Sequence, residues 1–208
     1  MIYERVEAER EILQGDIFHH VPRVDLSLST LPIVEDEGAH QANWSDVPVN
    51  SEVAAVLSVK SVTGIVITQN CDTRRGEYLC LAQVDSFLAV IGQNTAPKNP
   101  DKWQSLIVQQ AKTNARLFYL PADEGIGFKE AMAADFRIII RVARKDSENL
   151  RKHRGGVLNR VACEHFREAL SHFFRRYAYN EWYPLTKEQF EAYASRSSEP
   201  VDGYPWQL

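Results

Sequence analysis

Apolar and polar residues alternate with a period of two along much of the first 145 residues, and this alternation is typical of β-strands. Six segments are predicted to be strands, two of them (54–57 and 64–68) as continuous apolar runs: residues 16–21, 54–57, 64–68, 78–84, 115–120 and 135–142. The run Gly64–Thr68 is apolar at successive positions, so we expect a central strand that is buried on both faces. Residues 64–84 then predict a hairpin whose tip is the polar turn at 73–77.

Helices are predicted at the two ends of the chain and once between strands. Residues 4–13 have a helical composition that ends at Gly15, so they are a helix or an arm that feeds the first strand. Asn99-Pro100-Asp101 introduces a helix over 101–112. Beyond Asp146 the apolar period becomes 3.6, which predicts one long helix over 158–177. Thr186-Lys187-Glu188-Gln189 resembles a capping box and opens a last helix to Ser195.

These elements predict an α+β fold in two parts. A β-rich part spans residues 1–145, with a long acidic surface loop at 25–50 and the inserted helix at 101–112. A helical part, 146–208, packs on it. We expect either a small SH3-like barrel or a strongly bent antiparallel sheet.

The composition is that of a globular cytoplasmic protein. No run of about 18 apolar residues is present, so no membrane association is expected. The first residues are acidic, unlike a secretory signal peptide. The three cysteines form no paired short spacing, which favours free thiols in a reducing compartment over a disulfide framework, with a Cys71–Cys80 bridge as the alternative.

Charge is distributed unevenly along the chain. Residues 1–50 contain ten acidic residues and three arginines, whereas residues 137–176 contain eleven Lys or Arg and four acidic residues. The two regions either pack against each other or present solvated faces, or else the basic region binds nucleic acid. In that last case the predicted contacts are Arg151, Lys152, Arg154, Arg160 and Arg167, with Tyr177, Tyr179 and Trp182 stacking on bases.

Two short motifs resemble the MazF/PemK-like family. Gly15-Asp16-Ile17-Phe18 opens a strand, and Val66-Ile67-Thr68-Gln69-Asn70 ends a later one; the resemblance covers about residues 13–90. It implies an SH3-type barrel with an RNA-binding or RNA-cleaving face. Asp16 and Thr68 are the positions that match the family's motif on that face. Val62-Thr63-Gly64 stands where the family has an Arg-Pro dipeptide. The resemblance also implies a role in a toxin–antitoxin or phage-defence system.

Reactive side chains concentrate at the end of the central strand, Thr68-Gln69-Asn70-Cys71-Asp72. A Cys71 thiolate would need a neighbouring cation such as Arg74 or Arg75, and either arginine would also stabilise phosphate charge. The alternative is that Cys71 is a small buried side chain and that Asp72 shapes the turn. If the protein is an enzyme, the predicted catalytic residues are Asp16, Thr68, Cys71, Asp72 and Arg75.

No metal and no cofactor are predicted. Cys71 and Cys80 with the pair His19-His20 match no standard zinc spacing. His165, Glu168 and His172 share one helix face, but no second helix supplies matching ligands, so they are expected at the edge of the core. The chain lacks phosphate-loop, dinucleotide-glycine, nucleophile-elbow and kinase motifs.

The sequence therefore favours an accessory or regulatory binding protein over an enzyme. It would act through a protein partner, with RNA or DNA as a further ligand. Two enzymatic alternatives stay open: a divergent MazF/PemK-like endoribonuclease, and a hydrolase that depends on Cys71. The oligomeric state is not predicted.

Overall fold

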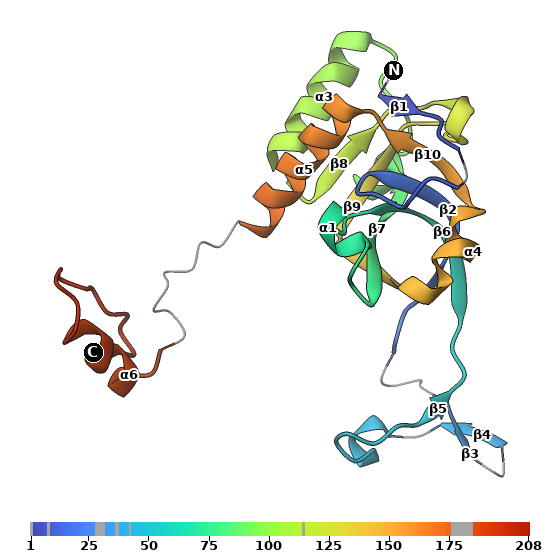
Figure 1. The fold of residues 1–208 in the computed structure, drawn as a ribbon. Coiled ribbons are helices and arrows are strands. Elements are labelled where there is room, and N and C mark those ends of the chain that lie inside the picture. Colours follow the sequence, from blue (N-terminus) through green and yellow to red (C-terminus); the bar gives the residue numbers. More distant parts are fainter. Residues whose placement is uncertain are drawn as a thin grey trace. The chain divides into compact units, whose positions relative to one another are not determined.

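The computed structural model describes residues 2–7, 9–27, 32–35, 38–41, 43–113, 115–175 and 185–208 (Figure 1). Its contacts divide the chain into two compact units, 1–170 and 171–208, which are described separately. The predicted division at residue 146 stays a prediction. No helix of the described residues is long and apolar enough to cross a membrane.

The first unit is built on a seven-stranded antiparallel sheet, so the predicted α+β class is confirmed (Figure 1). Its order is β1-β10-β2-β6-β7-β9-β8. The strands are β1 (Tyr3–Glu4), β2 (Asp16–Val24), β6 (Val59–Val66), β7 (Tyr78–Ser86), β8 (Leu117–Leu120), β9 (Met132–Ala143) and β10 (Arg154–Leu158). β1 and β8 are the two edges, so the described strands form an open sheet and not the closed barrel that was the first alternative.

The β6–β7 hairpin is confirmed, and β6 is the middle strand of the sheet. Ile65 and Val66 are fully buried there, as a strand covered on both faces requires. The connection contains a single helical turn, α1 (Asn70–Thr73). Register shifts in the β2–β6, β7–β9 and β2–β10 pairs mark bulges, which bend and twist strands locally.

Helices cover the sheet at two places. In α5 (Arg160–Phe174), Phe166 is fully buried, and its ring lies 5.1 Å from that of Phe118 on β8 and 5.6 Å from that of Phe136 on β9. The helix predicted at 101–112 is α3 (Pro100–Thr113), and its Trp103 packs edge-on against Phe87. The remaining helices of this unit are short: α2 (Phe87–Val90), α4 (Ser147–Arg151) and the 3-10 turns η3 (Glu124–Ile126) and η4 (Arg144–Asp146).

The local structure differs from the prediction at three places. Of the two alternatives for residues 4–13, the helix is wrong: β1 pairs with β10, and residues 5–7 and 9–13 form neither helix nor strand. No strand was predicted at residues 154–158, which form β10, and the long helix predicted from residue 158 begins at Arg160. The supposed loop 25–50 contains β3 (Pro32–Glu35), β4 (Gly38–Gln41) and η2 (Trp44–Asp46); with β5 (Ala54–Ala55), β3 and β4 form a second sheet in the order β4-β3-β5.

The second unit contains α6 (Lys187–Ala194), the predicted last helix. The capping box is confirmed, since Thr186 Oγ1 accepts from Gln189 N and Gln189 Oε1 accepts from Thr186 N. In the tail, Tyr204 stacks on Trp206 at 4.6 Å, and buried Gln207 donates to the carbonyl of Leu185. Tyr177, Tyr179 and Trp182, the predicted stacking residues, lie outside the described residues.

The Gly155-Gly156 pair has a packing role in β10. A Cβ on Gly155 would overlap the imidazole of His19 and would lie 3.0 Å from the Ile126 carbonyl oxygen. That imidazole is fixed by Thr63 Oγ1 at 3.1 Å and by the Ile126 carbonyl at 2.8 Å. Only glycine lets β10 pass so close to the ring.

We therefore expect Gly155→Ala to lower the free energy of unfolding by about 1–3 kcal/mol, the usual cost of overpacking. Urea denaturation measures this loss. In a His19→Ala background the same change should cost less than half as much, because the obstructing ring is gone. Equal costs in the two backgrounds would contradict the close contact.

Candidate anion-binding cleft

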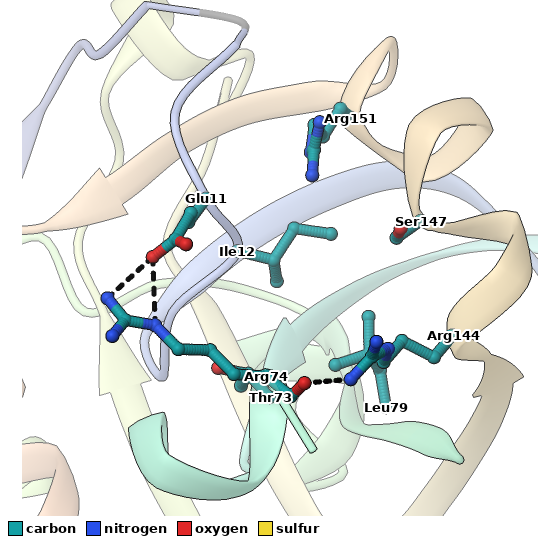
Figure 2. A pocket seen from close by; sticks show the side chains of 8 residues that line it. All are labelled: Glu11, Ile12, Thr73, Arg74, Leu79, Arg144, Ser147 and Arg151. Atoms are coloured by element: carbon teal, nitrogen blue, oxygen red, sulfur yellow. Dashed lines mark hydrogen bonds and ion pairs between the residues drawn. The ribbon is translucent and has the colours of Figure 1, made fainter. Parts of the chain in front are cut away.

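A cleft of about 280 Å³ lies where the N-terminal coil, α1 and α4 meet (Figure 2). Its lining comes from four separate parts of the sequence: Glu11, Ile12, Thr73, Arg74, Leu79, Arg144, Ser147 and Arg151. The floor is buried and mostly apolar, with Ile12, Thr73 and Leu79 each less than a tenth exposed. Three arginines and one carboxylate make up the charged lining, so the cleft carries an excess of positive charge.

Each arginine of the cleft is held differently (Figure 2). Arg74, which follows α1, pairs with Glu11 at 2.6 Å, and both side chains are more than half exposed. Arg144 donates from Nη1 to the carbonyl of Arg74. The Nε of Arg151 is buried and has no hydrogen-bond partner among the described residues. A buried donor without a partner is costly, and among the described arginines of the lining only Arg151 has one.

A buried ion-pair network holds the N-terminal coil beside the cleft. Asp16 is fully buried; it pairs with Arg10 at 2.7 Å and with Arg154 at 3.3 Å, and it accepts from the N–H of Leu13. Arg154 also donates to the carbonyls of residues 7, 10 and 11. The backbone position of Glu11 is therefore fixed by an arginine 143 residues further along the chain.

Electrostatics within this network favour a bound anion. Burial raises the pKa of the Asp16 carboxyl, while the Leu13 N–H, Arg10 and Arg154 oppose that rise. Burial lowers the pKa of Arg154; Asp16 opposes this, and the charges of Arg10 and Arg151 lower the pKa further. The Asp16 carboxylate thus pairs with both Arg10 and Arg154, and Arg151 lies near enough to affect Arg154. A ligand anion would reduce the repulsion among these guanidinium groups.

The predicted catalytic residues do not gather in one cleft. Asp16 is enclosed by its arginines, and Thr68 Oγ1 links the hairpin by accepting from Cys80 N at 2.7 Å. Cys71, Asp72 and Arg75 are exposed at the hairpin end and do not line the cleft. The Cys71 thiol donates to Gln69 Oε1 at 3.9 Å, and this amide oxygen is not a base that could activate it.

The predicted nucleic-acid contacts are also dispersed. Arg151 lines the cleft, and Lys152 next to it is exposed and donates to Asn149. Arg154 is only 4% exposed at its side chain and holds Asp16. Arg160 and Arg167 are exposed on α5, where Arg167 donates to Gln14 Oε1.

The residues considered for metal binding lie apart in the described structure, where no group of three or more His, Cys, Asp or Glu could hold an ion. His19 has both ring nitrogens engaged, as described above, and His20 approaches Ser61 at 3.3 Å. His165 and His172 are exposed on α5. All three cysteines are free thiols.

A second polar cluster lies across β7 and β9, and its charges largely neutralise one another. Buried Asp135 pairs with Arg137 at 2.9 Å and with Arg116 at 3.8 Å. Burial raises the pKa of Asp135, which Arg116 opposes and Asp85 reinforces. Since Arg116 and Arg137 are both paired with the Asp135 carboxylate, the cluster offers less positive charge to a ligand than the arginine cleft does.

Comparison with protein-family models and with curated proteins finds no match for this chain. The resemblance to MazF/PemK-like proteins stays a prediction. The cleft must therefore be judged from its own residues.

Sequence reasoning named Arg74 and Arg151 for different reasons and did not place them together. It missed Glu11, Arg144 and Ser147 altogether. Arg144 belongs to the basic stretch 137–176, whose composition was the available signal. Glu11 carried no signal, because its place in the cleft depends on the long-range contacts of Arg154.

We expect Asp16→Asn to lower the free energy of unfolding by about 3–5 kcal/mol, because it leaves buried guanidinium charge unpaired. Asp72→Asn is the matched control: the same substitution at an exposed position should change stability by no more than about 0.5 kcal/mol. Chemical denaturation of both variants measures the difference. Comparable stabilities would show that Asp16 is not the structural anchor described here.

The cysteines should react with a thiol reagent in order of exposure. Cys71 is exposed and should be modified first, followed by half-buried Cys80. Cys163 is buried; burial also raises the pKa of its thiol, so it should react only on unfolding. Time-resolved labelling of wild type, Cys71→Ser and Cys163→Ser assigns each phase. Fast labelling of Cys163 in the native protein would contradict its burial.

Proposed function

We propose that this protein is a non-catalytic accessory protein that binds the phosphate backbone of RNA or DNA at the arginine cleft. The observation that carries the proposal is the buried, unpartnered Nε of Arg151 in a cleft that Arg74 and Arg144 also line. Arginine suits this ligand because its planar fork matches phosphate oxygens bidentately.

The surface pair between Glu11 and Arg74 supports a site that can exchange one anion for another. Exposed ion pairs contribute only about 0–1 kcal/mol, so a phosphate that also reaches Arg151 can displace the Glu11 carboxylate. Glu11 then competes with the ligand and weakens binding to a single phosphate. A polymer overcomes this weakness by placing several phosphates along the basic surface that includes Lys152.

Binding is favoured over turnover because the candidate catalytic groups have structural partners. Asp16 and Thr68, the two positions that the family resemblance assigns, hold Arg154 and Cys80. The hydroxyl of Thr73 in the cleft donates to the Asn70 carbonyl. Of the other polar groups of the lining, Glu11 is paired with Arg74, and Ser147 provides a hydroxyl.

RNA is the first ligand to test, since the resemblance to MazF/PemK-like proteins points to an RNA-binding face. A role in a toxin–antitoxin or defence system and a cytoplasmic location belong to the same proposal. Phosphate-backbone contacts are independent of sequence, so the proposal expects RNA and DNA of matched length to bind with similar salt dependence.

Two substitutions in the cleft should change affinity in opposite directions. Arg151→Ala should weaken binding of a labelled 20-nucleotide single strand about tenfold and reduce the slope of log K against log salt by about one. Glu11→Gln should strengthen binding, because it removes the competing carboxylate. Fluorescence anisotropy at several salt concentrations measures both effects with RNA and with DNA.

Lys112→Ala in α3 removes one positive charge outside the cleft and is the matched control; its affinity should equal that of the wild type. Weaker binding in Lys112→Ala to the same degree as in Arg151→Ala would indicate general electrostatic attraction. Unchanged binding in both cleft variants would refute the cleft as the site.

A further inference from the structure

The 34 residues between β2 and β6 form an inserted arm, residues 25–58. Val24 and Val59 are register partners, so the arm leaves and re-enters the main sheet at one point. Its described parts are the sheet β4-β3-β5 and the turn η2. The arm is thus inserted between β2 and β6, which could pair as a hairpin without it.

The arm has almost no core of its own. Ile33 is its one buried hydrophobic residue among those described. Seven large apolar side chains are exposed instead, which is a high proportion for so short a segment: Leu26, Val34, Trp44, Val49, Val53, Val56 and Leu57. Small sheets of two- to four-residue strands are marginal without further packing, so this surface is expected to gain a cover.

The charge of the arm specifies what that cover is. Residues 25–58 contain six acidic residues and neither lysine nor arginine, although the whole chain has a net charge of only −4. Asp46 and Glu52 are exposed and form no ion pair with any described residue. Such a surface repels nucleic acid and attracts a basic polypeptide.

The edge of the small sheet supplies backbone groups for pairing. In the order β4-β3-β5, β4 lies at one edge and pairs only with β3. All four residues of β4, Gly38-Ala39-His40-Gln41, are exposed, and none is the lysine, proline or inward charge that usually protects an edge. An edge of this kind is suited to the addition of a strand from another chain.

We propose that the arm is a docking surface for a basic, strand-forming segment of a different protein. The segment adds to the edge of β4, its lysines or arginines pair with the acidic residues, and its apolar side chains cover the exposed valines and Trp44. This site is independent of the arginine cleft, so either proposal can fail alone.

The test uses full-length protein and a fluorescent ten-residue peptide that alternates lysine and valine. This peptide should bind at least tenfold more tightly than its glutamate–valine counterpart in an anisotropy titration at physiological salt. A lysine–valine peptide with N-methylated valines keeps the charge but cannot pair as a strand, and it too should bind at least tenfold more weakly. Equal affinity of the parent and N-methylated peptides would overturn strand addition.

The arm is identified as the site by a charge-matched comparison. The double variant Asp46→Asn, Glu52→Gln should lose several-fold in affinity for the lysine peptide, whereas Glu199→Gln, Asp202→Asn in the second unit should not. Replacing residues 25–58 by Asn-Gly, which joins Val24 to Val59, should abolish binding. Urea unfolding confirms that this variant is folded. Equal losses in the two double variants would overturn the proposal.

Two further measurements distinguish docking of a different protein on the arm from binding at the arginine cleft and from self-association of the chain. Arg151→Ala should bind the lysine peptide as the wild type does, because the cleft is not involved. Sedimentation velocity tests whether the cover is a second copy of the chain: concentration-dependent dimers that vanish without the arm would overturn the proposal of a different protein. A monomer that binds the lysine peptide supports it.

Discussion

The structure of the first unit depends on the buried pair of Arg154 and Asp16. Arg154 sits at the start of β10, and its guanidinium reaches the Asp16 carboxylate and three carbonyls of the N-terminal coil. Two charges removed from water are stable only if their remaining donors and acceptors are satisfied, and the coil provides those acceptors. The pair therefore fixes β10 against β2, and it fixes the backbone of the coil at residues 7, 10 and 11.

This constraint also determines the cleft. Glu11 and Ile12 lie in the coil held by Arg154, and they face α1 and the η4–α4 segment across the cleft. Arg151 ends α4 and lies three residues before Arg154 in the sequence. The Arg154–Asp16 pair that fixes the coil therefore also positions the end of α4. Positive charge accumulates here because one buried carboxylate cannot neutralise all the arginines that the fold requires. The positive charge of the cleft thus follows from the way in which the N-terminal coil is anchored.

Local patterns predicted the elements whose stability is local. The apolar run of β6, the hairpin to β7, the helix α3 and the capping box of α6 all follow from periodicity and from residues next to them in sequence. The segment 4–13 was predicted wrongly because its helix-forming composition is a weak preference, and pairing of β1 with β10 overrides it. β10 was missed because Gly155-Gly156 is typical of a turn. Gly155 is required in this strand because it packs against the ring of His19, which lies 136 residues earlier in the sequence. The cleft could be predicted only as a basic composition, since its lining combines residues 11, 74, 144 and 151.

Net charge was a poor guide to partners because the chain separates its charges. The whole chain is slightly acidic, yet the arm carries six acidic residues without lysine or arginine, and the cleft carries three arginines with one acidic residue. If the two regions neutralised each other in one molecule, ion pairs between them would be expected; the ion pairs of the described residues instead join the arm only at its base, where Asp25 meets Arg23 and Lys60. Separate surfaces of opposite sign can bind separate ligands, each of which the other surface would repel. Under the two proposals above, the protein holds a basic protein and a phosphate-bearing polymer at the same time, and this is what the proposed accessory role requires.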